Sequence, residues 1–248
     1  MNVNVLVTGG SRGIGRAIVT KLVAEGKGCA FTFVDDETAA EETIAQAREQ
    51  CSQTPVRAYR MNVRYPDQVE ATTERVLEDF GDLGAVVNNA AIVRNGAAAL
   101  MSDEDWDAVL QTDLSGPFYV IRSLLMHFLS NGGGRIVNIS SLAADGSSGQ
   151  ANYAAAKAGL IGLTRTVAKE YGAKGITSNA VTVGYVETDM TSHHMTQQLR
   201  DFWVTHCPQK RPGTAQEAAN LVHFLLSDEA AFVNGEIVRT AGGLTYAP

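Results

Sequence analysis

The chain has 248 residues, of which 45% are apolar and 19% are charged. This composition excludes a mainly disordered chain, because it supplies enough apolar surface to offset the entropy lost on folding. Twenty-seven acidic side chains against twenty basic ones leave a formal charge of −7. That balance argues against a general affinity for nucleic acid or for an anionic membrane.

The cysteines and the apolar runs indicate a cytoplasmic protein. Cys29, Cys51 and Cys207 are an odd and scattered set, which suits a reducing compartment and predicts no disulfide framework. No apolar run approaches the roughly 18 residues that a membrane span needs. The first eight residues show neither a basic flank nor a cleavage site. We therefore expect a soluble chain with no membrane or nucleic-acid partner.

Strand-like and helix-like segments alternate along the chain. Short apolar runs predict strands at residues 3–8, 29–34, 56–61, 83–88, 135–140, 177–183 and 236–240. Segments with helical period predict helices at residues 13–25, 39–50, 66–80, 103–130, 153–171 and 215–226. Apolar strands joined by helical crossovers favour an α/β fold with a doubly wound parallel sheet and helices on both faces. Because no linker or repeat interrupts the pattern, we interpret residues 1–248 as a single domain.

Residues 188–212 depart from this alternation. The segment mixes histidines, a tryptophan and two prolines without clean periodicity. Long excursions of this kind in compact domains often cover a site. We predict a substrate lid, with a plain surface insertion as the alternative.

The first predicted strand runs straight into the turn TGGSRGIG at residues 8–15, which opens a helix. Gly9 permits a tight turn, while Gly13 and Gly15 let a phosphate approach backbone N–H groups at the helix start. The placement between strand and helix predicts a dinucleotide-binding turn. Its predicted cofactor contacts are Gly9, Ser11, Arg12, Gly13, Ile14 and Gly15.

Tyr153 and Lys157 are four residues apart, which places them on one face of the predicted helix. A phenol with its ordinary pKa near 10 is a poor acid at neutral pH, and a neighbouring ammonium lowers that pKa. Tyr153 can then exchange a proton with a carbonyl or alcohol oxygen. A hydroxyl at the end of the fifth predicted strand, from Ser140 or Ser141, can donate to the same oxygen.

In combination these motifs resemble the short-chain dehydrogenase/reductase family. NNAA at residues 88–91, Asn179 and TAGG at residues 240–243 extend the resemblance over the whole chain. Residues 149–159 and 186–190 are especially similar to the 3-oxoacyl-[acyl-carrier-protein] reductase branch. The resemblance implies a Rossmann-type fold and a nicotinamide cofactor, NADP(H) or NAD(H). It implies a 3-oxoacyl thioester substrate, with acyl carrier protein as a candidate partner, and a homo-oligomer, commonly a tetramer.

The resemblance also assigns individual roles. The family serine falls on Ser141 when aligned from the strand and on Ser140 when counted back from Tyr153; we choose Ser141, because strand register controls side-chain direction. Lys157 would also hold the nicotinamide ribose, and Asp113 occupies the place of a fourth catalytic residue. The further cofactor contacts implied are Asn62, Val63, Asn89, Ala90, Val186 and Thr188.

Three positions depart from the family pattern. Asp113 replaces an Asn, and its charge would hold Lys157 as a cation while partly cancelling the lysine field at Tyr153, which predicts a shifted pH profile. Val183 replaces a Pro before Gly184, so the turn is less preset. Residues 131–134 lack the basic side chains of the carrier-protein reductases. Only Lys174 remains in a basic position, so support for docking of an acidic carrier is weaker.

The choice of nicotinamide cofactor depends on the residue just past the second strand, where an acid favours NAD(H). Counting from the glycine turn without gaps places Thr32 there, and Arg12 can meet a 2′-phosphate. This favours NADP(H). A slip of the register towards Asp35 would reverse the choice.

The remaining features concern assembly and the predicted lid. The helices at residues 103–130 and 153–171 are apolar over much of their surface and predict a homo-oligomer. His193 and His194 complete no metal-ligand set, so we predict no metal. Trp203, with Phe202 and Met195, would line an apolar substrate pocket, although helix packing explains them equally well. We predict that Cys207 is an unreactive thiol packed in the interior.

Two other functions stay open. One is an alcohol or sugar dehydrogenase of the same family that acts on a free carbonyl compound. The other is a weakly catalytic, cofactor-binding partner subunit, which the Asp113 and Val183 substitutions favour slightly.

Overall fold

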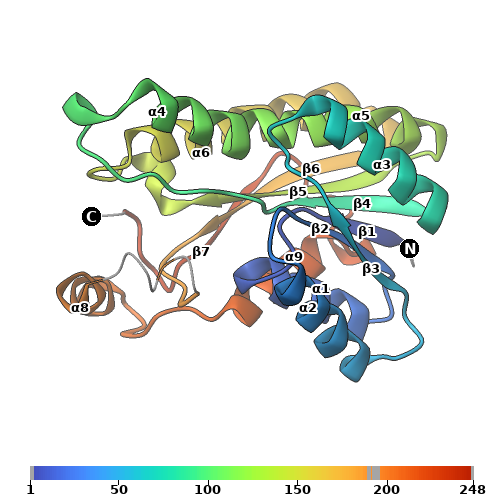
Figure 1. The fold of residues 1–248 in the computed structure, drawn as a ribbon, viewed down its shortest axis with the longest axis horizontal. Helices are drawn as coiled ribbons and strands as arrows, with labels where there is room; N and C mark the ends of the chain where they lie inside the picture. The colour runs from blue at the N-terminus through green and yellow to red at the C-terminus, as the bar shows by residue number, and fades with distance from the viewer. Residues whose placement is uncertain (1–2, 189–190, 192–195, 247–248) are drawn as a thin grey trace.

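The computed structural model describes residues 3–188, 191 and 196–246. Figure 1 shows one central sheet between two layers of helices. Its seven strands are all parallel, in the order β3-β2-β1-β4-β5-β6-β7. The strands are β1 (Asn4–Val7), β2 (Cys29–Phe33), β3 (Val56–Arg60), β4 (Leu83–Asn88), β5 (Gly134–Ser141), β6 (Ile176–Val183) and β7 (Ile237–Thr240).

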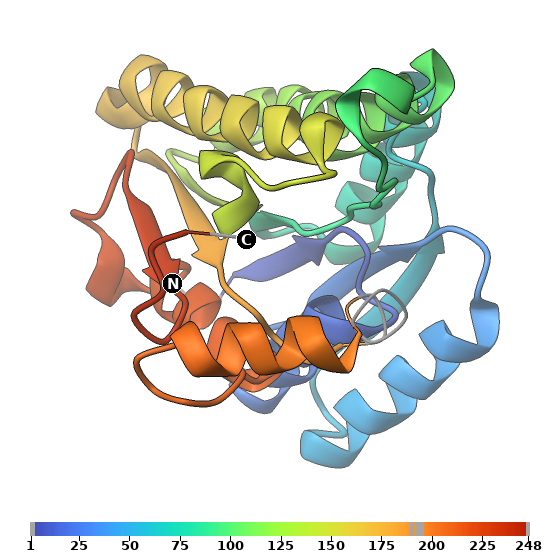
Figure 2. The same ribbon diagram turned by 90° about the vertical axis from the view of Figure 1, so that its left-hand side faces the viewer.

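Helices cover both faces of the sheet (Figures 1 and 2). One layer contains α1 (Gly13–Ala24), α2 (Glu37–Gln50) and α9 (Ala215–Leu225). The other contains α3 (Pro66–Phe80), α4 (Asp103–Leu110), α5 (Gly116–Ser130) and α6 (Ala151–Tyr171). The helix α8 (Gln197–His206) lies apart from both layers, beyond the carboxyl ends of the strands.

Alternation of side chains along the strands divides the core into two halves. Val5 and Val7 of β1 pack with Ile18 and Leu22 of α1 on one face. Leu6, between them in sequence, packs on the other face in the cluster that holds Leu124 of α5. Successive side chains of a strand point to opposite faces, so a sheet covered on both sides needs nearly continuous apolar strands.

The predicted segments agree with the observed ones to within two residues at each end, except for the predicted helix at 103–130. There the chain forms α4, a π-helical turn, η2 (Gln111–Ser115), and then α5. Pro117 has no N–H to donate to the Asp113 carbonyl four residues earlier, which explains why the helical hydrogen-bond pattern widens. Gly116 packs so closely that a Cβ there would lie 2.8 Å from the Val63 side chain. Asp113 therefore stands in a widened turn.

The predicted lid contains a regular helix. The Thr196 hydroxyl caps α8 by accepting from the Leu199 N–H at 3.2 Å. Asp189, Met190, His193, His194 and Met195 lie outside the described residues. Within the described ranges, no helix is long and apolar enough to cross a membrane. No group of three or more His, Cys, Asp or Glu side chains could hold a metal ion in the same part of the chain.

Candidate active site

The cleft that receives the predicted site residues opens at the carboxyl ends of the strands. The strand order reverses between β1 and β4, and α/β proteins bind ligands in the crevice at such a switch point. The cleft has a volume of about 580 Å³. Its predicted lining residues are Gly9, Ser11, Arg12, Gly13, Ile14, Gly15, Thr32, Asn62, Val63, Asn89, Ala90, Tyr153, Lys157 and Thr188. Val186 is the predicted cofactor contact that lines neighbouring cavities instead.

The glycine turn is held from behind by the segment that follows β4. The Thr8 hydroxyl accepts from the Asn89 and Ala90 N–H groups, each at 3.0 Å. The Asn89 amide donates to the carbonyls of Thr8 and Gly9 at 3.0 and 2.9 Å. A Cβ on Gly15 would lie 2.0 Å from the Gly9 carbonyl oxygen, so no side chain fits at that position. The turn is therefore fixed in shape.

The start of α1 is chemically suited to an anion. Gly13 stands at φ +54°, and the N-cap residue Arg12 makes no side-chain hydrogen bond to the helix. The first turn of α1 carries no acidic residue. Free N–H groups and the positive end of the helix dipole thus border the cleft, which fits the phosphates of a dinucleotide.

The structure corrects the placement of Thr32. β2 ends at Phe33, and Thr32 is a buried strand residue whose hydroxyl accepts from the Gly9 N–H at 3.3 Å. The first residue past the strand is Val34, which is 45% exposed and lines the cleft. The gapless count from the glycine turn ends inside β2, whereas the apolar run at residues 29–34 indicates the later strand end that the structure has. Asp35 and Asp36 follow, and Asp36 pairs with Arg12 at 2.7 Å.

Tyr153 and Lys157 lie one turn apart on α6, as their spacing predicts. The Lys157 ammonium is 5.3 Å from the centroid of the Tyr153 ring. Lys157 donates to the Ile139 carbonyl at 3.1 Å and lies 3.2 Å from a carboxylate oxygen of Asp113. The other oxygen of Asp113 accepts from the Ile92 N–H at 2.9 Å. The side chains of Lys157 and Asp113 are 3% and 0% exposed, so this ion pair is buried.

The groups around Tyr153 act on its pKa in both directions. Burial raises the pKa of Tyr153, and the Asp113 charge raises it further, while Lys157 and the Ser141 hydroxyl lower it. The pKa of Tyr153 is therefore raised overall, whereas the spacing to Lys157 alone predicts a lowered value. Burial lowers the pKa of Lys157, but the charges of Asp113 and Tyr153 outweigh it and raise the value. The pKa of Asp113 is raised by its burial, against the pull of Lys157.

Comparison with known proteins assigns the family. The family model described as "Enoyl-(Acyl carrier protein) reductase" matches residues 9–245. The 3-oxoacyl-[acyl-carrier-protein] reductase FabG of Escherichia coli (strain K12) is 40% identical over 240 residues, which cover 96% of each chain. The chain belongs to the short-chain dehydrogenase/reductase family. It is therefore an oxidoreductase.

Other relatives agree with this assignment. FabG of Staphylococcus aureus (strain N315) is 38% identical over 245 residues, 98% of each chain. Among solved structures, levodione reductase superposes with a TM-score of 0.95 at 33% identity and covers 98% of this chain and 97% of its own. A Serratia marcescens short-chain dehydrogenase/reductase mutant has a TM-score of 0.92 at 30% identity, with 98% of each chain covered. The family thus includes relatives with different named substrates.

Two adjacent serines end β5 of this short-chain reductase, and they differ in what their hydroxyls do. Ser140 is buried, and its single O–H donates to the Lys157 carbonyl at 3.1 Å. The Ser141 oxygen accepts from the Ala143 N–H at 3.2 Å, so its own proton is directed elsewhere, and the Tyr153 phenol lies within its hydrogen-bonding reach. Ser141 as the catalytic serine stays a prediction, and this difference supports it.

A second cavity adjoins the cleft at Tyr153. Its volume is about 520 Å³, and Tyr153, Ile14, Ile139 and Thr188 line both cavities. The walls are mainly apolar, with an amide pair formed where Gln150 donates to Asn95 at 3.0 Å. Further lining residues are Ser140, Ser141, Val93, Leu142, Ala143, Val183, Tyr185, Val186, Leu199 and Trp203.

The sequence predicts only part of the lining of this second cavity. Trp203 lines the cavity and packs on Tyr185, with ring centroids 5.9 Å apart. Phe202 packs on His206 instead, at 4.1 Å between ring centroids. Asn95 and Gln150 were not among the predicted site residues, although Gln150 stands one helical turn before Tyr153. That spacing was the available signal.

The turn after β6 is fixed by β7 rather than by a proline. The Gly184 N–H donates to the Thr240 carbonyl at 3.0 Å, and Val183 pairs with Thr240 in the sheet. A Cβ on Gly184 would lie 2.7 Å from that of Ala241. The neighbouring Cys207 is a buried thiol whose sulfur lies 3.4 Å from the Gly242 carbonyl oxygen.

Proposed function

We propose that this chain reduces a 3-oxoacyl thioester to the 3-hydroxyacyl product with NADPH. One observation carries the proposal. Tyr153 stands where a cleft suited to a dinucleotide meets an apolar cavity, with Lys157 behind it and Ser141 in the wall of the apolar cavity. A cofactor on one side and an acyl substrate on the other would bring the reacting carbonyl to the same phenol.

The residues of the chain divide the chemistry between them. A dihydronicotinamide held in the cleft by the glycine turn would supply a hydride to the carbonyl carbon. Ser141 donates a hydrogen bond to the carbonyl oxygen and stabilises the negative charge that develops there. Tyr153 gives its proton to that oxygen, so one C–H bond and one O–H bond form as the C=O π bond breaks. The Lys157 cation stabilises the phenolate that remains and would hold the nicotinamide ribose.

The preference for NADPH is supported by the end of β2. Val34, the first residue past the strand, carries no charge that would repel a 2′-phosphate, and Arg12 lines the same part of the cleft. Asp35 and Asp36 act in the opposite sense, and Asp36 already neutralises Arg12 in part. NADH is therefore the alternative, and kinetics with both cofactors separate the two.

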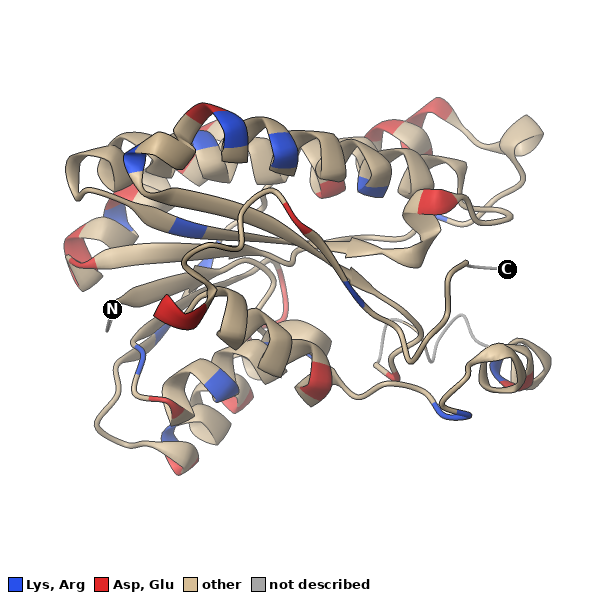
Figure 3. Ribbon diagram, turned by 180° about the vertical axis from the view of Figure 1, so that it is seen from behind, with Lys and Arg blue, Asp and Glu red and all other residues tan. Residues whose placement is uncertain are grey.

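The thioester substrate is supported by relatives and by the cavity. The FabG proteins of Escherichia coli and Staphylococcus aureus are named for the reduction of 3-oxoacyl groups on acyl carrier protein. An apolar cavity of about 520 Å³ suits an acyl chain. Carrier docking has less support, because residues 131–134 carry no basic side chain, although Lys174 is exposed. Figure 3 shows basic and acidic positions interspersed along the helices of that view.

A free carbonyl substrate is the second candidate. It is favoured by the fold match to a protein named levodione reductase, at a TM-score of 0.95. The basic and acidic positions are interspersed along the helices, and this arrangement is compatible with a free substrate as well as with a carrier-bound one. A short-chain alcohol or sugar dehydrogenase would use the same Tyr153 and Lys157.

The proposal extends to assembly and location. We propose one domain over residues 1–248, with residues 188–212 as the substrate lid, and a homo-oligomer, expected to be a tetramer. Phe118 and Met126 support association, because α5 leaves them 43% and 70% exposed. Three cysteines without disulfides fit the cytoplasm.

The experiment is a substrate panel with the purified protein. NADPH and NADH oxidation are followed with 3-oxoacyl thioesters of graded length on coenzyme A and on acyl carrier protein, and with free ketones. We expect turnover of thioesters with NADPH. Faster turnover of free ketones would favour the dehydrogenase alternative. NADPH binding without turnover across the panel would favour a cofactor-binding partner subunit.

A further inference from the structure

Asp113 is a carboxylate enclosed entirely by protein groups. It stands in the widened turn between α4 and α5, and its side chain is 0% exposed. One oxygen accepts from the Ile92 N–H at 2.9 Å, and the other lies 3.2 Å from the Lys157 ammonium. Each of these contacts has a separate consequence, because the first needs only an acceptor atom and the second needs a negative charge.

The charge reaches further than Lys157. Tyr153 lies on the same helix, with its ring centroid 5.3 Å from the lysine nitrogen. Water screens buried charges poorly, so the carboxylate and the ammonium both act on the phenol. They act with opposite signs, since the ammonium favours the phenolate and the carboxylate disfavours it.

Other titratable groups border the site at a greater remove. Arg94, in the segment after β4, pairs with Asp105 of α4 at 3.7 Å. Glu187, after β6, pairs with Arg200 of α8 at 2.5 Å. The charged groups on the rest of the cofactor cleft are Arg12, Asp35, Asp36 and Arg64. The charges that act on the Tyr153 pKa are those of Lys157 and Asp113.

We infer that Asp113, paired with Lys157, is a positioning residue that keeps Tyr153 protonated to a higher pH than the lysine alone would allow. The second half of the inference rests on the proposed function. Carbonyl reduction uses the neutral phenol as its acid, so a phenol that keeps its proton extends reduction towards alkaline pH. Oxidation of the product alcohol needs the phenolate, so it starts at a correspondingly higher pH.

Asp113→Asn separates the two contacts of this side chain. The amide keeps nearly the same size and an oxygen for the Ile92 N–H, while it removes the charge and places an N–H donor beside Lys157 in place of an acceptor. The carboxylate also raises the pKa of Lys157, so the comparison is made at a pH where Lys157 is still an ammonium; there, with the carboxylate gone, the ammonium acts on the phenol unopposed. At a pH where roughly a tenth of the parent Tyr153 is ionised, we expect about fivefold more phenolate in the variant.

The direct readout needs neither cofactor nor substrate. Phenolate absorbance is titrated in the parent and in Asp113→Asn, each minus its own Tyr153→Phe counterpart, so that the difference reports Tyr153 alone. A Tyr153 titration at lower pH in Asp113→Asn supports the inference. An unchanged or higher titration in a protein of native circular dichroism overturns it. If Asp113→Asn does not fold, Asp113→Ser replaces it in the same comparison.

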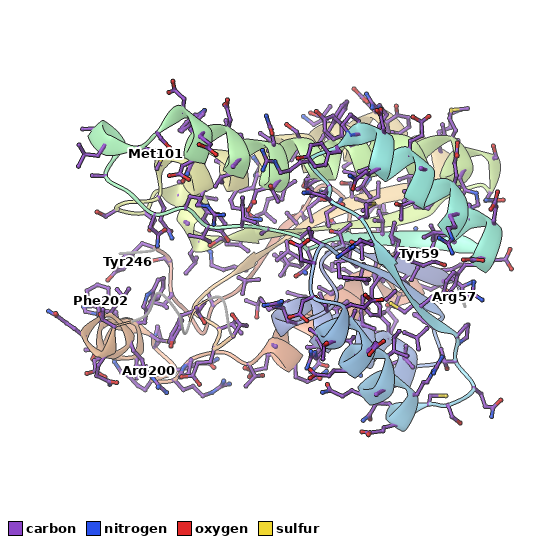
Figure 4. The ribbon with its side chains drawn as sticks, in the orientation of Figure 1. Arg57, Tyr59, Met101, Arg200, Phe202 and Tyr246 are labelled. Atoms are coloured by element: carbon purple, nitrogen blue, oxygen red, sulfur yellow. The ribbon has the colours of Figure 1, made fainter. Side chains whose placement is uncertain are left out.

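Asp79→Asn is the matched control. Asp79 lies on α3, where it accepts from the Tyr59 hydroxyl at 2.7 Å and pairs with Arg57, also at 2.7 Å. Figure 4 shows Arg57 and Tyr59 together on β3, away from α8. The control removes the same charge from the chain, so an equal shift of Tyr153 in Asp79→Asn would overturn a specific role for Asp113.

The pH–rate curves provide the second readout. For Asp113→Asn, the alkaline limb of reduction and the rising limb of oxidation should both move to lower pH. Limbs that do not move, in a variant that still turns over, would overturn the inference. A parent protein without reductase activity would instead contradict the proposed function, and the absorbance titration would still test Asp113.

Discussion

At the scale of residues, the proton affinity of Tyr153 depends on the charged atoms that lie near it. The spacing of Tyr153 and Lys157 was sufficient to predict that they share a helix face, because that face follows from the geometry of any helix. The raised pKa of Tyr153 was not predictable from spacing. It depends on burial and on a carboxylate oxygen 3.2 Å from Lys157, which only the widened turn brings there.

Arg12 and Asp36 predict a change in cofactor preference. Asp36→Asn frees the guanidinium that the carboxylate now holds at 2.7 Å and leaves an oxygen to cap α2 through the Ala39 N–H. We expect kcat/KM for NADPH to rise several-fold relative to NADH.

Arg12→Ala should lower kcat/KM for NADPH by roughly tenfold to a hundredfold, the usual size of a lost charge-assisted hydrogen bond. Equal effects on both cofactors would contradict contact between Arg12 and a 2′-phosphate.

The two serines at the end of β5 predict different defects. Ser141→Ala removes the hydroxyl that would donate to the substrate carbonyl and should lower kcat by about 10²- to 10³-fold with little change in Tm. Ser140→Ala removes the hydrogen bond to the Lys157 carbonyl and should cost about 1 kcal/mol of unfolding free energy, read as a lower Tm. If Ser140→Ala caused the greater loss of kcat at unchanged Tm, the two roles would have to be exchanged.

At the scale of elements, apolar runs and helical periods were enough to predict most segment ends. The predicted helix at 103–130 was wrong because the apolar period continues through residues 111–115 while the hydrogen bonding does not. Gly116 and Pro117 were the available signal for the break. The helix within residues 188–212 was not defined from sequence, because α8 has no buried residue to set a clear period.

The helix α8 predicts a selective effect on substrate affinity. Arg200 pairs with Glu187 at 2.5 Å, and Trp203 of the same helix lines the apolar cavity. Figure 4 shows Arg200 and Phe202 on α8, at the edge of the molecule. Arg200→Ala should raise KM for the carbonyl substrate several-fold and leave KM for the cofactor unchanged, because the pair joins α8 to the segment after β6.

Lys21→Ala is the control for that experiment. Lys21 of α1 pairs with Glu25, the residue just past the end of that helix, and neither side chain lines the apolar cavity. Surface pairs contribute little to stability, so neither variant should change Tm by more than a degree or two. Identical KM values for Arg200→Ala and Lys21→Ala would argue against a role of α8 in substrate binding.

For the whole molecule, the parallel order of seven strands follows from strands that are apolar on both faces and separated by helices. The position of the site was predictable for the same reason, because the glycine turn after β1 and the NNAA segment after β4 end at one edge of the sheet. The boundary between the two cavities was not predictable from the sequence, because it depends on how α6, α8 and β6 pack around Tyr153.

The exposed face of α5 predicts self-association. Phe118 and Met126 lie eight residues apart on that helix, with Arg122 placed 5.3 Å from the Phe118 ring centroid. A double substitution, Phe118→Asp with Met126→Asp, puts charge on this face and should reduce the mass seen by light scattering at micromolar concentration. Phe232→Asp, which changes a fully exposed side chain outside α5, is the comparison. A parent protein that is already a monomer would contradict the prediction.

The central claim is that the Tyr153 phenol delivers the proton to the substrate oxygen. The direct measurement is the single-turnover rate of Tyr153→Phe with NADPH and a 3-oxoacyl thioester, alongside NADPH affinity and Tm. We predict a loss of about 10³-fold in rate, with affinity and Tm close to those of the parent, because the ring still fills its place between the two cavities. A folded, NADPH-binding Tyr153→Phe protein that reduces the substrate at the parental rate would contradict the mechanism.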